Sequence, residues 1–149
     1  DSLHHLAGSR NLIEIHGSLH RLRCTECPHS RSVPDFAGMP IPPLCPACGG
    51  VMRPNVVLFG EQLPVRGIAR LEAILASGLD LVVSIGTTSV FPYIAGPVVW
   101  AHRTGVPTVE INPGETDVSP IVTHHLHMRA ADALPELWRR MHPPELAED

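Results

Sequence analysis

Four cysteines are the residues whose spacing points most directly to chemistry. They form two C-x-x-C pairs with 17 residues between them, Cys24 with Cys27 and Cys45 with Cys48. Two such pairs about 15–20 residues apart are typical of a zinc site built only from thiolates. Because thiolates would fill all four tetrahedral positions, the pattern predicts a structural Zn²⁺ with no position left for water. Two disulfides or a redox-active C-x-x-C are the alternatives.

One histidine stands close to these cysteines in the sequence. His16 lies eight residues before Cys24, inside the segment E-I-H-G-S at residues 14–18. Imidazole changes its protonation near neutral pH, so this position suggests general base chemistry beside the metal. The other nine histidines receive no role, since most histidines are ordinary surface or core residues: His4, His5, His20, His29, His102, His124, His125, His127 and His142.

Length and composition limit the remaining possibilities. The chain has 149 residues, about one domain, with 11 basic and 15 acidic side chains and a net charge of −4. This balance argues against direct nucleic-acid binding, which normally uses a basic face. No apolar run reaches the roughly 18 residues that a membrane span needs, and no signal peptide is recognisable. Cysteines committed to metal suit a reducing compartment, so we expect a cytoplasmic protein.

The elements that must position these residues follow from the apolar pattern. Residues 1–21 combine a short amphipathic stretch with an alternating segment at 11–15 that predicts a strand, and residues 22–55 form a turn-rich zinc module. Beyond it, strands are expected at 56–59, 79–85, 107–111 and near 126–128, and helices at 64–77, 93–103 and 131–141. Strands that alternate with helices indicate an α/β fold with a doubly wound parallel sheet, in which the zinc module is an insertion.

Small and polar residues follow three of these expected strands. They lie at residues 60–61, 86–89 and 112–114. Ligands of open parallel sheets bind beyond the carboxyl ends of the strands, where backbone amides reach phosphate oxygens and hydroxyl or amide groups hold ribose. The segments therefore predict a nucleotide site, although ordinary βα turns favour the same residue types. The dinucleotide fingerprint G-x-G-x-x-G is absent.

The motifs, taken in order, resemble those of a known family. They are D-S-L-H-H-L-A-G at residues 1–8, E-I-H-G-S at 14–18, the paired C-x-x-C, R-P-N-V-V-L-F-G-E at 53–61, I-G-T-T at 85–88 and E-I-N at 110–112. Over essentially its whole length the chain is similar to the sirtuins, the NAD-dependent protein lysine deacylases, and most of all to the bacterial forms. The resemblance implies a Rossmann-like sheet and an enzyme that transfers the acyl group of an acyl-lysine protein or peptide to ADP-ribose and releases nicotinamide.

The resemblance also implies a role for individual residues. His16 would be the general base that activates a ribose hydroxyl after nicotinamide has left. Val57, Phe59 and Gly60 would pair with the acyl-lysine peptide and line its tunnel. The residues implied for NAD are Gly86, Thr87, Thr88, Asn112, Pro113, Gly114 and Ala130, and those implied for structural Zn²⁺ are Cys24, Cys27, Cys45 and Cys48.

The chain departs from the family at three places. Leu58 replaces a frequent aromatic residue, the stretch from Gly86 to Pro92 is one residue shorter than usual, and the motifs G-A-G-I-S, F-R and T-Q-N do not precede Asp1. We therefore expect residues 1–149 to be the C-terminal portion of one sirtuin-type catalytic domain, with little activity alone and an unpaired sheet edge. The zinc module would span residues 20–55, and the Rossmann-like region would comprise residues 1–19 and 56–149. A non-catalytic zinc-ribbon interaction module and an NAD- or ADP-ribose-binding protein are the alternatives.

Overall fold

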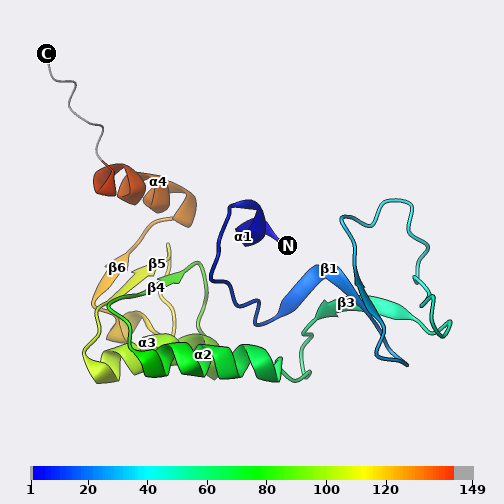
Figure 1. Ribbon diagram of the computed structural model, residues 1–149. Coiled ribbons are helices and arrows are strands. Elements are labelled where there is room, and N and C mark those ends of the chain that lie inside the picture. Colours follow the sequence, from blue (N-terminus) through cyan, green and yellow to red (C-terminus); the bar gives the residue numbers. More distant parts are fainter. Residues whose placement is uncertain (1, 143–149) are drawn as a thin grey trace, which may run out of the picture. The chain divides into compact units, whose positions relative to one another are not determined.

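The computed structural model describes residues 2–142. The chain divides into two compact units, residues 1–73 and 74–149. The first contains an antiparallel sheet and the second a parallel sheet (Figure 1). None of the helices between residues 2 and 142 has the length and apolar character needed to span a membrane.

A three-stranded antiparallel sheet forms the centre of the first unit. Its strands β1 (Gly17–Cys24), β2 (Ser30–Ser32) and β3 (Met52–Val56) are ordered β2-β1-β3, and a short helix, α1 (Leu3–Leu6), precedes them. Pro54 is tolerated in β3 because this strand lies at the edge of the sheet. The buried core of this unit comprises two of the cysteines and three apolar side chains: Leu22, Cys24, Val33, Cys45 and Met52. Packing and metal ligation therefore depend on the same few residues.

Two predictions for the first unit are wrong. Residues 11–15 form no strand, because their backbone closes local turns: Ile15 N–H donates to the Ile13 carbonyl at 3.1 Å and Gly17 N–H to the Glu14 carbonyl at 2.9 Å. The expected buried strand at 56–59 is instead the end of β3 and an exposed loop, with 93% of Phe59 accessible. The Glu61 carboxylate holds this loop, since it accepts the Leu58 N–H at 3.0 Å and pairs with the Arg53 guanidinium at 2.5 Å.

The second unit contains the predicted parallel sheet. Strands β4 (Val82–Ile85), β5 (Thr108–Ile111) and β6 (His124–Leu126) are ordered β4-β5-β6, and both pairs are parallel. The described helical elements of this half are α3 (Pro92–Thr104), η1 (Ser119–Ile121), α4 (Ala130–Met141) and the end of α2 (Val65–Ser77), which contains the unit boundary. Helix α3 contacts β4 and β5. The fold class predicted from alternating strands and helices is confirmed.

Helix ends agree with the sequence pattern better than strand ends do. Helices α2 and α3 stop at Gly78 and Gly105, whose φ angles of 85° and 74° lie in the left-handed region that favours glycine. Strand β4 begins at Val82, three residues later than expected. The last strand is β6 at residues 124–126, not 126–128, because polar histidines occupy its first two positions and hid it from an apolar pattern.

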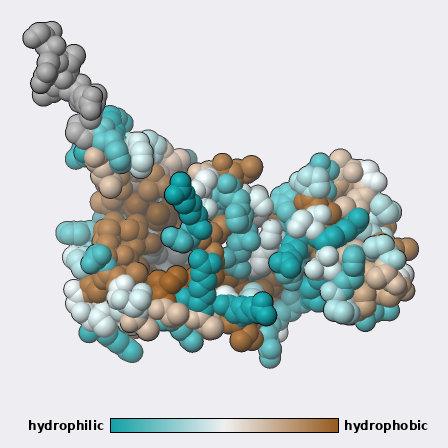
Figure 2. Space-filling model, in the orientation of Figure 1, coloured by the Kyte–Doolittle hydropathy of each residue, from teal (hydrophilic) through white to brown (hydrophobic). Residues whose placement is uncertain are grey.

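Strand β4 forms one edge of the parallel sheet in the described chain. Its side chains Val83 and Ile85 remain 43% and 42% exposed. Figure 2 shows apolar surface gathered over the unit that carries this sheet. An edge strand with apolar neighbours is suited to pairing with another strand.

Ser89, in the loop after β4, is held in a costly conformation. Its φ of 55° is left-handed, the residue is 1% exposed, and its buried hydroxyl has no hydrogen-bond partner among residues 2–142. We expect Ser89→Gly to raise the free energy of unfolding by about 1 kcal/mol, because it removes both the backbone strain and the unsatisfied hydroxyl. Chemical denaturation measures this, and Ser89→Ala, which keeps the strain, should stabilise less. Equal stabilisation by both variants would contradict the role of the backbone.

Candidate active site and metal centre

The four cysteines of the first unit converge on one point. Their sulfurs all lie within 4.8 Å of one another, with Cys24 and Cys48 Sγ 3.5 Å apart and Cys27 and Cys45 Sγ 3.6 Å apart. A tetrahedral Zn²⁺ with bonds of about 2.3 Å separates its sulfur ligands by about 3.8 Å. The geometry fits this ion, and the cluster predicted from the C-x-x-C spacing is confirmed. The two disulfides considered from the sequence are not formed, since all four cysteines are free.

Hydrogen bonds shift the pKa values of the Cys24 and Cys48 thiols in opposite directions. The Glu26 N–H, which donates to Cys24 Sγ at 3.4 Å, lowers the pKa of the Cys24 thiol to about 7. The Gly50 N–H acts in the same sense on Cys48, but hydrogen bonding with the Cys27 and Cys24 thiols outweighs it and raises the pKa of Cys48 to about 12. Without metal the cluster therefore holds protons that zinc must displace.

Zinc binding is accordingly expected to weaken as the pH falls. Thiolates bind the metal, so each proton that returns to a sulfur opposes the ion, and the stability that zinc contributes is lost on acidification. A competition titration with a chelator between pH 8 and pH 5 should show the apparent zinc affinity falling steadily toward the acid end. An affinity that does not change with pH would show that the sulfurs are not the ligands.

His16 lies in the turn that leads into β1. Its carbonyl accepts the Val57 N–H at 2.9 Å, so the backbone of the turn is fixed to the residue that follows β3. The histidine is exposed and borders a cavity of about 380 Å³ whose other described lining includes Glu14, Gly17, Val56 and Val57. The structure thus brings Val57 to His16. Phe59 and Gly60 lie in the exposed loop beyond, outside this cavity.

Gly17 permits the turn that carries His16. Its φ is 77°, and a Cβ atom placed there would lie 1.9 Å from the Asn55 carbonyl oxygen on the paired strand β3. Only glycine fits so close an approach of two backbones.

Gly17→Ala is therefore expected to lower the free energy of unfolding by more than the ~1–3 kcal/mol of left-handed strain alone, because the Asn55 clash adds to it. Gly38→Ala is the matched control, since Gly38 also has a left-handed φ of 68° but nothing within 4 Å of an added Cβ. Denaturation curves of the two variants measure the difference. Equal losses would mean that the clash has no effect.

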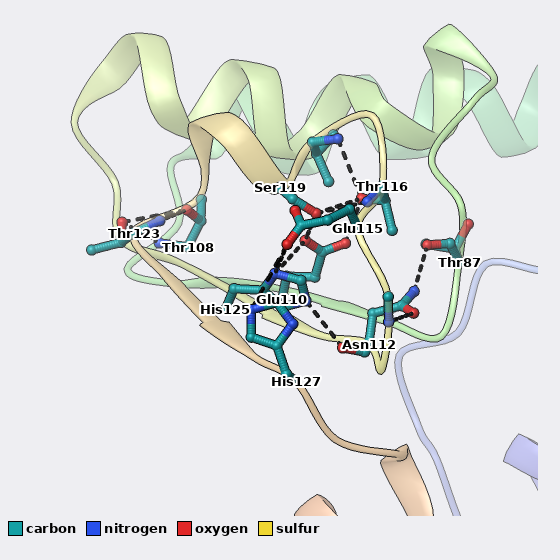
Figure 3. A network of polar contacts seen from close by, with 12 residues as sticks. Thr87, Thr108, Glu110, Asn112, Glu115, Thr116, Ser119, Thr123, His125 and His127 are labelled. Atoms are coloured by element: carbon teal, nitrogen blue, oxygen red, sulfur yellow. Dashed lines mark hydrogen bonds and ion pairs between the residues drawn. The ribbon is translucent and has the colours of Figure 1, made fainter.

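The turns after β4 and β5 meet at the carboxyl ends of the parallel strands. The Asn112 side-chain amide donates to the Thr87 carbonyl at 3.0 Å, and the Gly114 N–H donates to Asn112 Oδ1 at 3.2 Å (Figure 3). Gly86, with a φ of 63°, donates its N–H to the Ile111 carbonyl at 3.0 Å and so joins the same edge.

The other residues predicted for the nucleotide are placed as follows. Thr88, Pro113 and Gly114 lie in these turns, and the Thr88 carbonyl accepts the Asp117 N–H at 3.3 Å. Ala130 begins α4 and lies outside the hydrogen-bonded network. Two of the three predicted polar segments, residues 86–89 and 112–114, therefore lie together after β4 and β5. The placement of residues 60–61 at the same sheet edge is wrong, because they follow β3, which belongs to the antiparallel sheet of the first unit.

A buried carboxylate beneath these turns was not predicted. Glu110 on β5 is 0% exposed, and its oxygens accept the Thr116 hydroxyl at 2.5 Å and the Ser119 hydroxyl at 2.6 Å. Two donors offset some of the cost of burying this group. A charged residue inside an otherwise apolar strand, followed by closely spaced hydroxyl residues, was the available sequence signal.

Comparisons with known proteins agree with this architecture. A sequence model described as the Sir2 family matches residues 1–92. NAD-dependent protein deacylase 2 of Pseudomonas syringae pv. tomato is 46% identical over 140 residues, which are 92% of this chain and 56% of that protein. NAD-dependent protein deacylase 1 of Archaeoglobus fulgidus is 38% identical over 148 residues, 95% of this chain and 57% of that protein.

Solved structures give the same result. A crystal structure of a Sir2 homolog–NAD complex superposes with a TM-score of 0.83 at 37% identity and covers 94% of this chain and 54% of that one. A Sir2 homologue–ADP-ribose complex superposes with a TM-score of 0.87 at 38% identity, over 93% of this chain and 55% of that one. The chain spans about half the length of the relatives it matches. On the family match, the identities and the shared fold, this chain belongs to the Sir2 family, the sirtuins.

Proposed function

We propose that this protein is an NAD-dependent protein lysine deacylase, an acyltransferase that uses NAD as co-substrate. The observation that carries the proposal is the meeting of the Thr87 and Asn112 turns at the carboxyl edge of a parallel sheet, in a chain of the Sir2 family. Similar chains are named as deacylases, and similar structures are described as complexes with NAD and with a p53 peptide. Acyl-lysine proteins or peptides are the proposed substrates.

The residues after β4 are suited to the phosphates of NAD, and those after β5 to the ribose of its adenosine. Gly86 has no side chain to hinder phosphate oxygens, and the Thr87 and Thr88 hydroxyls are suitable donors to them. Asn112 and the backbone of Pro113 and Gly114 are suited to hydrogen bonds with the ribose hydroxyls. Ala130, a small residue at the start of α4, is assigned to the neighbourhood of the adenine on the family resemblance alone.

His16 is proposed as the general base. Bound NAD supplies the electrophilic ribose carbon that accepts the acyl oxygen, and this chain supplies the group that takes a proton from a ribose hydroxyl. The backbone of His16 is fixed through Val57, while its ring borders an open cavity that a substrate can enter. Such fixation favours the orientation that proton transfer requires.

The loop after β3 is proposed as the peptide site. Val57, Phe59 and Gly60 follow directly on an edge strand, and Phe59 presents 93% of its surface. Pairing of a peptide backbone with such a segment gives affinity through main-chain hydrogen bonds with loose sequence preference. The bond between Glu61 and Arg53 keeps the loop in place before substrate arrives.

The zinc site is assigned a structural role. Sulfur ligands fill the tetrahedron, so the ion has no position for water or substrate, and it holds together the core around Cys24 and Cys45. Thiols kept for metal suit a reducing environment, and we place the protein in the cytoplasm on this ground.

The test uses the protein expressed from its complete coding sequence. An acetyl-lysine peptide should lose its acetyl group only when NAD is present, and Asn112→Ala should raise the KM for NAD by about tenfold or more, because a hydrogen bond to the nucleotide is lost. Asn11→Ala, an exposed asparagine far from the turns in sequence, is the control and should leave KM unchanged. NAD binding without deacylation would identify a binding protein instead, and deacylation without NAD would exclude the proposal.

A further inference from the structure

Three side chains near β6 form a cluster that the proposed deacylase chemistry does not use. His125 and His127 are two residues apart, so the alternation of an extended chain puts both on one face. Their ring centroids are 3.8 Å apart. Glu115, in the loop after β5, lies against both rings (Figure 3). The cluster belongs to the second unit and is distinct from the four cysteines of the first.

We propose that Glu115, His125 and His127 bind a second metal ion, a divalent transition metal such as Zn²⁺. One oxygen, Glu115 Oε1, lies 3.9 Å from His125 Nδ1 and 3.8 Å from His127 Nε2, and the three ligand atoms lie within 4.8 Å of one another. Bonds of about 2.0–2.2 Å to a tetrahedral ion would place these atoms about 3.3–3.6 Å apart. Glu115 is 72% exposed in its side chain and can move the few tenths of an ångström required.

The hydrogen bonding of His125 prepares it as a ligand. Its Nε2 lies 3.0 Å from the Asn112 carbonyl oxygen, which only accepts, so Nε2 carries a hydrogen. In the neutral ring this leaves the lone pair on Nδ1, the atom that faces Glu115. A histidine whose other nitrogen donates to a backbone carbonyl is the common arrangement at metal sites, because the carbonyl fixes both tautomer and ring orientation.

A second carboxyl group, that of Glu110, also lies beside His125 Nδ1. His125 Nδ1 lies 3.8 Å from Glu110 Oε2 as well as 3.9 Å from Glu115 Oε1. Glu110 is fully buried, and its oxygens accept the Thr116 hydroxyl at 2.5 Å and the Ser119 hydroxyl at 2.6 Å. Oxygens of two carboxyl groups therefore face the same imidazole nitrogen, and a cation placed between them would be attracted to all three atoms.

The ligand set indicates which ions fit. Two imidazole nitrogens and one carboxylate oxygen suit Zn²⁺, Co²⁺, Ni²⁺ and Cu²⁺ and are a poor match for Ca²⁺ or Mg²⁺, which prefer oxygen ligands. Three protein ligands leave a fourth position for water. This donor set differs from four sulfurs, so the two sites can be told apart by spectroscopy.

The test is a zinc count on the intact protein. After incubation with excess Zn²⁺ and removal of free ion by gel filtration, two zinc ions per chain are expected by elemental analysis. Protein loaded with a single equivalent of Zn²⁺, which the four sulfurs bind first, should develop a weak visible band when titrated with Co²⁺, without the strong sulfur-to-cobalt absorption of a thiolate site.

Variants of the cluster decide where the second ion sits. His127→Ala and Glu115→Gln are expected to lower the affinity for the second zinc ion by at least about tenfold and to leave the affinity for the first unchanged. His124→Ala is the matched control, since His124 is an exposed neighbour on the opposite face of β6. Circular dichroism checks that each variant is folded. One zinc per chain in the unaltered protein would mean that a proton, and no metal, occupies the cluster. That result, or a second equivalent that survives His127→Ala, would overturn the proposal.

Discussion

Replacement of His16 with alanine is expected to lower the rate of deacylation by about 10²–10⁴-fold, the usual contribution of a positioned general base. The ring is exposed and the contact that fixes the turn is made by the His16 backbone, so the substitution should leave the fold and the zinc content intact. Steady-state rates with an acetyl-lysine peptide and saturating NAD measure the effect. His102→Ala, an exposed histidine on α3, is the control and should keep the unaltered rate.

A second readout separates a base from a merely structural residue. In the proposed chemistry the base acts after nicotinamide has left, so exchange of labelled nicotinamide into NAD should persist in His16→Ala while deacylation is lost. Loss of exchange and deacylation to the same extent would show that the variant fails to bind substrate or to fold. Full deacylation by His16→Ala would exclude this histidine as the base.

Loss of one zinc ligand is expected to unfold the first unit. Zinc binding contributes on the order of 10 kcal/mol to small metal-dependent folds, and Cys24 and Cys45 belong to the buried core of this unit. Cys45→Ser should therefore lose the ion bound by the cysteines. Hydrogen exchange should show that strands β1 and β3 lose their protection, while the parallel strands β4, β5 and β6 retain theirs.

The matched control for this substitution is Ser32→Ala, a change of similar size on the exposed strand β2. It should keep both the zinc and the protection of β1 and β3. If Cys45→Ser retained its zinc and its protected amides, the sulfurs would not be structural ligands. If the parallel sheet lost its protection as well, the two units would not unfold independently.

The features that could be predicted are those that local sequence determines. The spacing alone predicted the cluster of Cys24, Cys27, Cys45 and Cys48. Each C-x-x-C pair makes its own tight turn, so only the meeting of the two turns depends on non-local contacts. Glycine marked the ends of α2 and α3, since few other residues adopt a left-handed φ. The alternation of strands and helices likewise predicted the parallel sheet and its polar edge.

The features that were missed depend on tertiary partners. Within residues 2–142 no strand pairs with the alternating segment at 11–15, so its apolar pattern does not produce a strand. Strand β6 is formed by parallel pairing with β5, which overrides the polarity of His124 and His125. The burial of Glu110 left only a weak local signal, one charged residue within an apolar strand, and no local pattern indicates that Glu115 meets two histidines. The close approach of Gly17 to Asn55 likewise requires knowledge of the β1–β3 register.

Identifying the product that carries the acyl group is the most direct test of the proposed reaction. The protein from its complete coding sequence is incubated with NAD and an acetyl-lysine peptide, and the products are identified by mass spectrometry. We predict one nicotinamide and one O-acetyl-ADP-ribose for every peptide deacetylated. Free acetate formed while NAD stays intact would contradict the proposed acyl transfer.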